Sequence, residues 1–162
     1  MEESRTIEQR LLAVEDHIAI GQLVGAYGYA IDGRNKDVLG RIYAEDGVYA
    51  VGDTGTFAGR EAIQAIADMP GHIALVEAGC AHISTNPQIV IDGDRASATC
   101  HTMVGAHGDG GFFIWRLSAS QLMLSRKPEG GWQIDHRQNY LLQGDPEGPA
   151  LLARAADGPA PA

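Results

Sequence analysis

Apolar residues recur every three or four positions over residues 7–31, which is the spacing of an amphipathic helix. Thr6 and Gln9 have the spacing of a capping box and predict the start of this helix, while Asp32-Gly33 predicts its end. A second, short helix is predicted over residues 36–44, because its apolar side chains would share one face. We therefore expect the N-terminal part of the chain to be helical.

From residue 46 onward, alternating and β-prone residues broken by glycines replace the helical pattern. They predict a short hairpin over 46–58, two strands over 79–107, a long strand over 112–127 and a last strand over 132–142. Between the first two of these, a helix begins near residue 60 and Pro70-Gly71 is expected to end it.

The remaining segment, residues 144–162, is rich in Pro, Gly and Ala. We expect a single domain over residues 1–143 and an irregular tail after it. Leu151 and Leu152 of this tail could pack on a neighbouring subunit.

Helices first and long strands last indicate the α+β fold class, with an antiparallel sheet curled around the N-terminal helices. A curled sheet of this size leaves a conical cavity, lined by the inward faces of the strands and of the first helix, where a small apolar molecule can bind. The long strand over 112–127 carries apolar residues on both faces, which predicts that a partner covers the outer face. We therefore expect a homodimer or a homotrimer.

Composition and charge exclude several partners. A net charge of −9 on 162 residues argues against nucleic acid and anionic membranes. No apolar run approaches the ~18 residues of a membrane span. The two cysteines, Cys80 and Cys100, form no disulfide framework, so we expect a cytoplasmic location. Each cysteine is expected to pack as a small buried apolar residue. No cofactor is expected, because the GDGG segment at 108–111 precedes a strand rather than a phosphate-binding helix.

Three of the six histidines lie in the two strands over 79–107. With Asp92-Gly93 as the turn, alternation places His82, His101, Met103 and His107 on one face of the sheet. In that register His101 is the diagonal neighbour of His82.

A different turn changes the pairing of these histidines. If Gly93-Asp94 forms the turn, or if a bulge occurs near Asn86-Pro87, His107 becomes the neighbour of His82 instead. Both registers stay open at this point. A metal site made of the three histidines is not expected, since ligands so far apart along two strands rarely converge on one ion.

Asp32 lies at the end of a largely apolar helix rather than on a charged face. One interpretation is structural, with the aspartate starting a turn together with Gly33. The other is catalytic, because a carboxylate bonded to one ring nitrogen of His82 would fix the tautomer and leave the other nitrogen to take a proton. Such a pair suits proton abstraction beside an activating group, which is the first half of a β-elimination.

The order of elements resembles the SnoaL-like branch of the nuclear transport factor 2-like superfamily over residues 8–142. The resemblance rests on the YAIDGRN helix end, the AEDGVY strand start, the GTFAGREAI strand-to-helix step, the AHISTN segment and the GGWQIDHRQNY strand. That branch includes scytalone dehydratase, bile-acid dehydratase and hexachlorocyclohexane dehydrochlorinase. It implies a cystatin-like α+β barrel in which a helix-end aspartate pairs with a histidine base on the third strand. Those positions fall on Asp32 and His82.

The resemblance implies further catalytic residues. A second histidine on the following strand of scytalone dehydratase matches His107, and a tyrosine of the bile-acid enzyme matches Tyr27. An arginine on the last strand, which assists the leaving group in the dehydrochlorinase, matches Arg137. On a straight helix Tyr29 competes with Tyr27 for its place. Alternation allows only one of Arg137 and His136 to face the cavity.

The other predicted site residues would contact substrate. Gln121 stands where scytalone dehydratase has a substrate-binding asparagine. The remaining residues expected at the cavity wall are Tyr49, His101, Met103 and Trp115.

We therefore expect a lyase that needs no cofactor and performs a dehydratase-like elimination on a small apolar cyclic, polyketide-like or steroid-like compound. His82 would be the general base and Asp32 would orient it. An isomerase or cyclase of the ketosteroid-isomerase type would need the same base. An alternative from another class is a protein that only binds a small ligand or forms oligomers. A pair open to a cavity favours the enzyme, and a pair sealed in the core favours this alternative.

Overall fold

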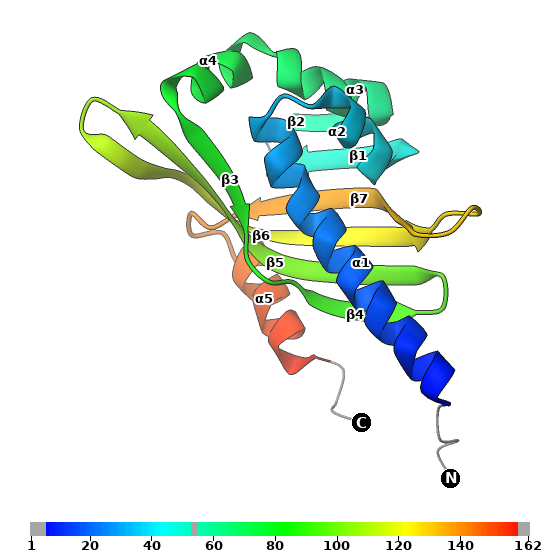
Figure 1. The fold of residues 1–162 in the computed structure, drawn as a ribbon. Coiled ribbons are helices and arrows are strands. Elements are labelled where there is room, and N and C mark those ends of the chain that lie inside the picture. Colours follow the sequence, from blue (N-terminus) through cyan, green and yellow to red (C-terminus); the bar gives the residue numbers. More distant parts are fainter. Residues whose placement is uncertain (1–5, 53–54, 159–162) are drawn as a thin grey trace.

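The computed structural model describes residues 6–52 and 55–158, and a long helix crosses the concave face of its curved sheet (Figure 1). The helices are α1 (Ile7–Asp32), α2 (Lys36–Ile42), α3 (Arg60–Ala65), α4 (Pro70–Ala78) and α5 (Glu147–Asp157), with one helical turn, η1, over Ile66–Asp68. The strands are β1 (Tyr43–Val51), β2 (Gly55–Ala58), β3 (Cys80–Ser84), β4 (Gln88–Asp92), β5 (Arg95–Gly108), β6 (Gly111–Arg126) and β7 (Trp132–Leu141). The predicted α+β fold class is confirmed.

The strands form one sheet in the order β2-β1-β7-β6-β5-β3, and β4 also pairs with β5. Among the described strands, all pairings are antiparallel except that of β1 with β7, which is parallel. The sheet is therefore mixed rather than wholly antiparallel as predicted. No hairpin joins β1 to β7, so their relative direction is not set by a turn. The sheet stays open, with β2 at one edge and both β3 and β4, which pair with β5, at the other.

The helix α1 begins at the predicted capping box. The Thr6 hydroxyl accepts a hydrogen bond from the Gln9 amide at 3.2 Å, and the Gln9 side chain accepts one from the Thr6 amide at 2.8 Å. Only the second half of the helix is buried, through Ile20, Val24, Tyr27, Gly28, Ala30 and Ile31. This half places Asp32 beside the start of β3.

Asp16 anchors the middle of α1 to the far ends of β6 and β7. Its carboxylate accepts two hydrogen bonds from the Arg126 guanidinium, at 2.9 and 2.8 Å, and one from the Trp132 indole at 2.9 Å. The bond from Arg126 contributes most to lowering the pKa of Asp16 below its ordinary value. The direction in which α1 crosses the sheet is therefore fixed at this point as well as at β3.

The contact between α1 and β3 is so close that one position tolerates no side chain. A Cβ atom on Gly28 would collide with the backbone carbonyl oxygen of His82. Gly21 and Gly25, on the same helix, have open space at the equivalent position. The missing side chain at residue 28 therefore sets the distance between α1 and β3.

Residues 70–78 form a helix that the sequence pattern did not predict. Pro70 was expected to end the preceding helix, but it occupies the first turn of α4, where a proline has no helical hydrogen bond to lose. The preceding helix ends instead in η1. His72 is consequently helical rather than part of a loop, and its Nε2 donates to the carbonyl oxygen of Ile31 at 2.9 Å.

The predicted hairpin over residues 79–107 is interrupted on its first strand. Residues 85–87 separate β3 from β4, and both strands pair with β5. The turn is formed by Gly93-Asp94, since Asp92 pairs with Arg95. Proline at position 87 cannot donate to the ladder, which is consistent with the break at this point.

The interruption moves the register of β3 by one further residue, so that His82 pairs with Val104. Because cross-strand partners share a face, His82 lies on the concave face together with Val104. His101, Met103 and His107 alternate with the buried residues of β5 and lie on the opposite face. The prediction that these three residues share the face of His82 was therefore wrong in both registers.

Residues 144–162 were predicted to be irregular, yet α5 forms within them and packs on the outer face of the sheet. Its Gly148 lies against Ala119 and Tyr140, which pair across β6 and β7 and face away from the concave side. Leu151 is only 2% exposed. This leucine is therefore buried against its own chain rather than against a neighbouring subunit.

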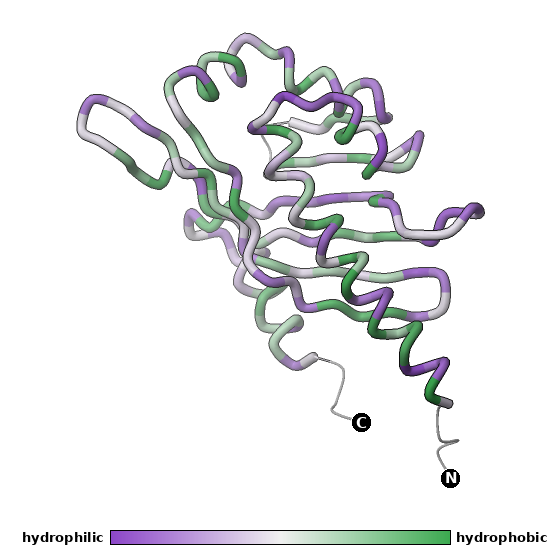
Figure 2. Tube along the Cα trace, in the orientation of Figure 1, coloured by the Kyte–Doolittle hydropathy of each residue, from purple (hydrophilic) through white to green (hydrophobic). Residues whose placement is uncertain are grey.

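Among the described residues, exposed large apolar side chains gather on the first half of α1 and at the start of β6. The first half of α1 extends past the sheet with apolar segments along it (Figure 2), and its exposed apolar residues are Ile7, Leu11, Leu12, Val14 and Ile18. The start of β6 exposes Phe112, Phe113, Ile114, Trp115 and Leu117. Within residues 6–52 and 55–158, no helix combines the length and apolar character that a bilayer span requires.

We propose that a second copy of this chain covers these surfaces in a homodimer or homotrimer, because so many large apolar side chains are costly to leave in water. Light scattering at micromolar concentration should give the mass of the assembly. Replacing Phe112 and Phe113 by serine should shift that mass toward the monomer. A monomeric mass for the unchanged protein would contradict the proposal.

Gly28→Ala should destabilise the fold by about 1–3 kcal/mol, since the added methyl group meets backbone rather than a movable side chain. Gly25→Ala is the matched control on the same helix. It should leave stability unchanged or raise it by about 0.5–1 kcal/mol, because alanine favours a helix over glycine. Denaturant unfolding measures both, and equal effects of the two substitutions would show that the α1–β3 contact is not tight.

Candidate active site

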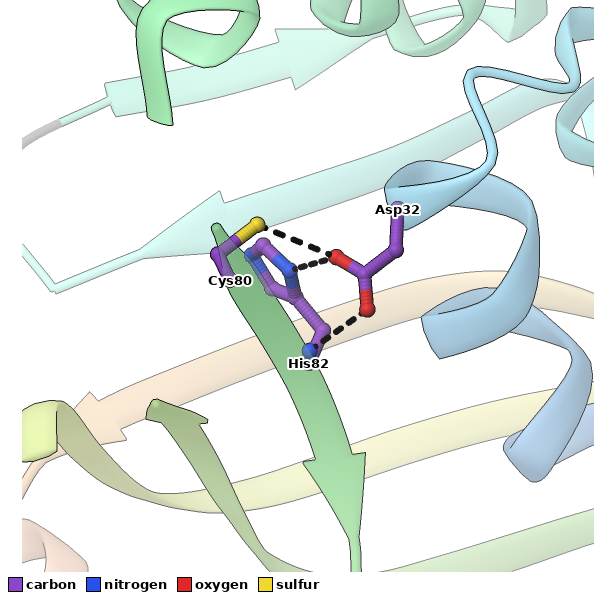
Figure 3. A group of neighbouring side chains, drawn as sticks. All are labelled: Asp32, Cys80 and His82. Carbon is purple, nitrogen blue, oxygen red and sulfur yellow. Dashed lines mark hydrogen bonds and ion pairs between the residues drawn. The ribbon is translucent and has the colours of Figure 1, made fainter. Parts of the chain in front are cut away.

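Asp32 and His82 meet where the end of α1 reaches β3 (Figure 3). The Oδ1 atom of Asp32 lies 2.6 Å from His82 Nδ1, and its Oδ2 atom accepts a hydrogen bond from the His82 backbone amide at 2.7 Å. The two side chains are mostly buried, with 24% of the Asp32 side chain and 11% of the His82 side chain exposed. The carboxylate is therefore fixed by both the main chain and the ring of the same residue.

Cys80 adds a third donor to this carboxylate. Its thiol lies 3.5 Å from Asp32 Oδ1, two residues before His82 on the same face of β3 (Figure 3). Burial, together with the negative charge of Asp32, raises the pKa of the Cys80 thiol to about 11, so it remains a protonated donor. Cys80 was predicted to be a small apolar residue, whereas only Cys100 fits that description.

The balance of forces on Asp32 keeps it ionised. Burial alone raises the pKa of this carboxyl, but the hydrogen bonds from His82 and Cys80 outweigh burial and lower the pKa below its ordinary value. An ionised carboxylate can only accept hydrogen bonds. His82 Nδ1 therefore carries a proton, and Nε2 is the ring nitrogen that does not contact Asp32.

His82 lines a cavity of about 250 Å³ at the open end of the sheet. Most of its wall is apolar or aromatic, and the lining residues from the helices α1 and α4 and the strands β1, β2 and β6 include Tyr27, Ile31, Tyr49, Phe57, Leu75 and Trp115. A smaller space of about 10 Å³ adjoins it, bordered by His82, Arg116, Arg137 and Asn139 among others. The Asp32–His82 pair is therefore beside a cavity and is not sealed in the core.

Arg137 faces this interior and is 3% exposed, while His136 beside it on β7 is exposed. The Arg137 guanidinium lies over the ring of Tyr27, 4.2 Å from its centroid. Its Nε donates to Asn139 Oδ1 at 3.2 Å, and its Nη1 has no hydrogen-bond partner among the described residues. Alternation thus places Arg137, and not His136, at the site.

A chain of buried polar groups holds Arg137 in place. Asn139 Oδ1 also accepts from the Ser120 hydroxyl at 2.5 Å, and the Asn139 amide donates to the Tyr49 hydroxyl at 3.1 Å. Ser120 lies 2.7 Å from the hydroxyl of Thr102. The inner wall at β1, β5, β6 and β7 is therefore cross-linked by hydrogen bonds rather than by apolar packing alone.

The structure brings together some of the predicted site residues. Tyr27 is buried at the cavity, with its ring centroid 6.5 Å from that of His82, whereas its competitor Tyr29 is 83% exposed. Tyr49 and Trp115 line the same cavity. Burial raises the pKa of Tyr27 well above its ordinary value, so its hydroxyl stays protonated.

Other predicted residues lie elsewhere. His107 is exposed at the end of β5, where its ring contacts Phe112 with centroids 5.0 Å apart, and His101 is exposed in the middle of β5. Gln121 alternates with the inward residues Ser120 and Leu122 and so faces outward. Met103 borders only the small cavity. The shift of register at residues 85–87 explains the displacement of both histidines.

Two residues of the site were missed. His72 on α4 lines the cavity with its ring centroid 5.9 Å from that of His82. The helix that carries His72 could have been predicted from Pro70, since proline is favoured in the first turn of a helix. Arg116 lines both cavities from β6. Its inward position could not be read from the alternation of β6, because the pairing of β5 with β6 shifts between Val104 and Gly105.

Asp32, Cys80 and His82 are also the described groups best placed to hold a metal ion, with their ligand atoms within 4.8 Å of one another. A cation would have to replace the short Asp32–His82 bond, and the raised pKa of the Cys80 thiol disfavours the thiolate that metals prefer. The three groups therefore fit a hydrogen-bonded pair with a supporting thiol better than a metal centre.

Asp32→Asn should lower stability at neutral pH by roughly 1–3 kcal/mol, because the ionised carboxylate accepts charge-assisted hydrogen bonds. The pKa of Asp32 is lowered in the folded state from the ordinary 3.8, so its contribution is complete above that value and is lost as the pH falls through the lowered pKa. The stability difference between the two proteins should thus shrink in acid. Asp109→Asn, at an exposed turn, should show neither effect in pH-dependent thermal unfolding. A difference that persists at the lowest pH would contradict this explanation.

Comparisons with known proteins agree with this arrangement. Residues 12–138 match the family model of the SnoaL-like domain. An NTF2-like protein with a cystatin-like fold from Novosphingobium aromaticivorans is 36% identical, over 94% of this chain and 98% of its own, with a TM-score of 0.87. A protein of unknown function from Mycobacterium tuberculosis is 18% identical, over 94% of this chain and 92% of its own, with a TM-score of 0.72.

The hexachlorocyclohexane dehydrochlorinase LinA-type3 from Novosphingobium barchaimii is 17% identical, over 84% of this chain and 96% of its own, with a TM-score of 0.70. No curated protein matches the chain. The family match covers most of the sequence, and the resemblance inferred from the short motifs is confirmed. The chain belongs to the SnoaL-like family and has the cystatin-like fold of NTF2-like proteins.

Proposed function

We propose that this protein is a lyase that performs a dehydratase-like elimination on a small, largely apolar cyclic, polyketide-like or steroid-like compound. The observation that carries the proposal is the Asp32–His82 pair, which lies within hydrogen-bonding distance at the wall of a mostly apolar cavity of about 250 Å³. Elimination is also the reaction named for one protein of the same fold, a dehydrochlorinase.

His82 is the general base in this proposal. Its Nδ1–H donates to Asp32, which leaves Nε2 to accept a proton from a carbon beside an activating group of the substrate. The ring becomes an imidazolium, and the ionised carboxylate of Asp32 stabilises that charge. The electron pair of the broken C–H bond forms the new double bond as the bond to the leaving group breaks. The imidazolium then passes its proton to a departing hydroxide, which leaves as water, or to solvent where a halide leaves. Three hydrogen-bond donors hold the carboxylate still, so it needs no reorganisation when the proton is transferred.

Departure of the leaving group calls for a donor on the other side of the substrate. Arg137 supplies the positive charge of its buried guanidinium, and Tyr27 lines the cavity with a hydroxyl that stays protonated because its pKa is raised. Both residues border the small cavity next to His82. In the proposal they polarise the substrate or stabilise the group that leaves.

Two other functions use the same geometry and differ in outcome. An isomerase would return the proton to a second carbon, so no group would be lost from the substrate. A protein that only binds its ligand would catalyse neither proton exchange nor elimination. Mass spectrometry of ligands incubated with the protein in deuterated water separates all three, because it reports both deuterium uptake and loss of water or halide.

The base and its orienting carboxylate should act as one unit. With a compound selected by a thermal-shift screen of cyclic ketones and alcohols, His82→Gln should lower the rate by about 10²–10⁴, the usual value of a general base. Asp32→Asn should cost a similar amount, and the double variant should be little slower than the slower single variant.

His101→Gln makes the same substitution at an exposed histidine on the outer face of β5, so it is the matched control and should retain most of the rate. Losses that simply multiply in the double variant would mean that Asp32 and His82 have separate roles. Full activity of His82→Gln would remove the base and end the mechanism.

A further inference from the structure

Two arginines border the small space that adjoins the cavity of His82, and neither has a carboxylate partner among the described residues. Arg137 is buried, its Nε donates to the neutral Asn139, and its guanidinium lies over the rings of Tyr27 and Tyr49. Arg116 is partly buried, and its one described interaction is with the ring of Trp115, whose centroid is 5.4 Å from the guanidinium carbon. Both border the small cavity beside His82.

Three other described arginines form ion pairs with aspartates, whereas Arg116 and Arg137 do not. Arg126 binds Asp16 and Asp94, Arg34 binds Asp68, and Arg95 binds Asp135. The described lining of the His82 cavities contains no aspartate or glutamate. The nearest carboxylate of the site, Asp32, is already occupied by His82.

This arrangement leaves the site positively charged in a chain whose net charge is −9. Two guanidinium groups bordering one partly desolvated space repel each other, and an anion bound at Arg116 from the larger cavity would relieve that repulsion. A guanidinium presents its N–H groups as a planar fork that matches a carboxylate. The wall offers no lysine or phosphate-binding loop among the described residues.

Arg116 also lies at a boundary between spaces. It lines the His82 cavity and an adjoining outer cleft of about 610 Å³, and Val51 and Trp115 are shared by the same two spaces. A ligand anchored at Arg116 would therefore place an apolar ring toward His82 and keep its charged group near the opening.

We infer that the substrate of this site carries a carboxylate, which Arg116 binds while the apolar part of the molecule lies in the cavity beside His82. Arg137 strengthens the attraction from the interior. That the ligand is the substrate rests on the proposed function, whereas its binding can be measured without any reaction. Arg116 is thus the residue that selects an acid over a neutral compound of the same shape.

Benzoate and benzamide test this inference, since they have nearly the same size and differ in charge. Isothermal titration of the unchanged protein, at fixed ionic strength, should show benzoate binding about tenfold or more tightly than benzamide. Arg116→Met keeps an apolar stem on Trp115 and should remove this preference while leaving benzamide binding unchanged. Arg41→Met, an exposed arginine on α2, removes the same charge elsewhere and should leave the preference intact.

Equal binding of the two probes, no benzoate binding at millimolar concentration, or an undiminished preference in Arg116→Met would overturn the inference. The comparison of benzoate with benzamide on the unchanged protein tests the inference even if Arg116→Met fails to fold. Titration of His82→Gln separates this inference from the lyase. Benzoate should still bind there, so an intact preference with no His82-dependent reaction on any acid would end the lyase proposal and leave the carboxylate site standing.

Discussion

The hydrogen bonds between Asp32, the last residue of α1, and strand β3 stabilise the fold and position the residues of the site. Asp32 accepts bonds from the backbone amide and the ring of His82 and from the thiol of Cys80. A free backbone amide at this edge and an ionised carboxylate at a helix end would each be costly if buried alone. The hydrogen bond between the two groups removes both costs, and it requires the close approach of α1 to β3 that Gly28 permits.

The rest of α1 is held against the sheet in a way that keeps Asp32 next to His82. Asp16 binds Arg126 and Trp132 at the opposite end of the sheet, so α1 is fixed at two points and cannot rotate without breaking one of them. The buried residues between these points lie on the sheet side of the helix. The position of Asp32 against His82 is therefore set by packing along the second half of α1 and not only by the local bond.

Much of this could be predicted from residue patterns, because it depends on local chemistry. The capping box of α1, the strands after residue 46 and the pairing of Asp32 with His82 follow from spacing, alternation and family motifs. What could not be predicted depends on register. A break of three residues at 85–87 moved His101 and His107 to the outer face, and no local signal fixed how the chain would re-enter the ladder. Pro70 had two valid interpretations, as a helix end or a helix start, and only tertiary packing distinguishes them.

The charge of the cavity beside His82 could not be predicted from the sequence either. A sequence shows that Arg116 and Arg137 exist, but not that every described aspartate near them is already engaged. Because Asp32 binds His82, the imidazole is held in one orientation by the carboxylate, while the buried guanidinium of Arg137 has Asn139 and aromatic rings as its described partners. The hydrogen bonds at the end of α1 thus orient His82, while the positive charge beside it comes from the guanidinium groups of Arg116 and Arg137.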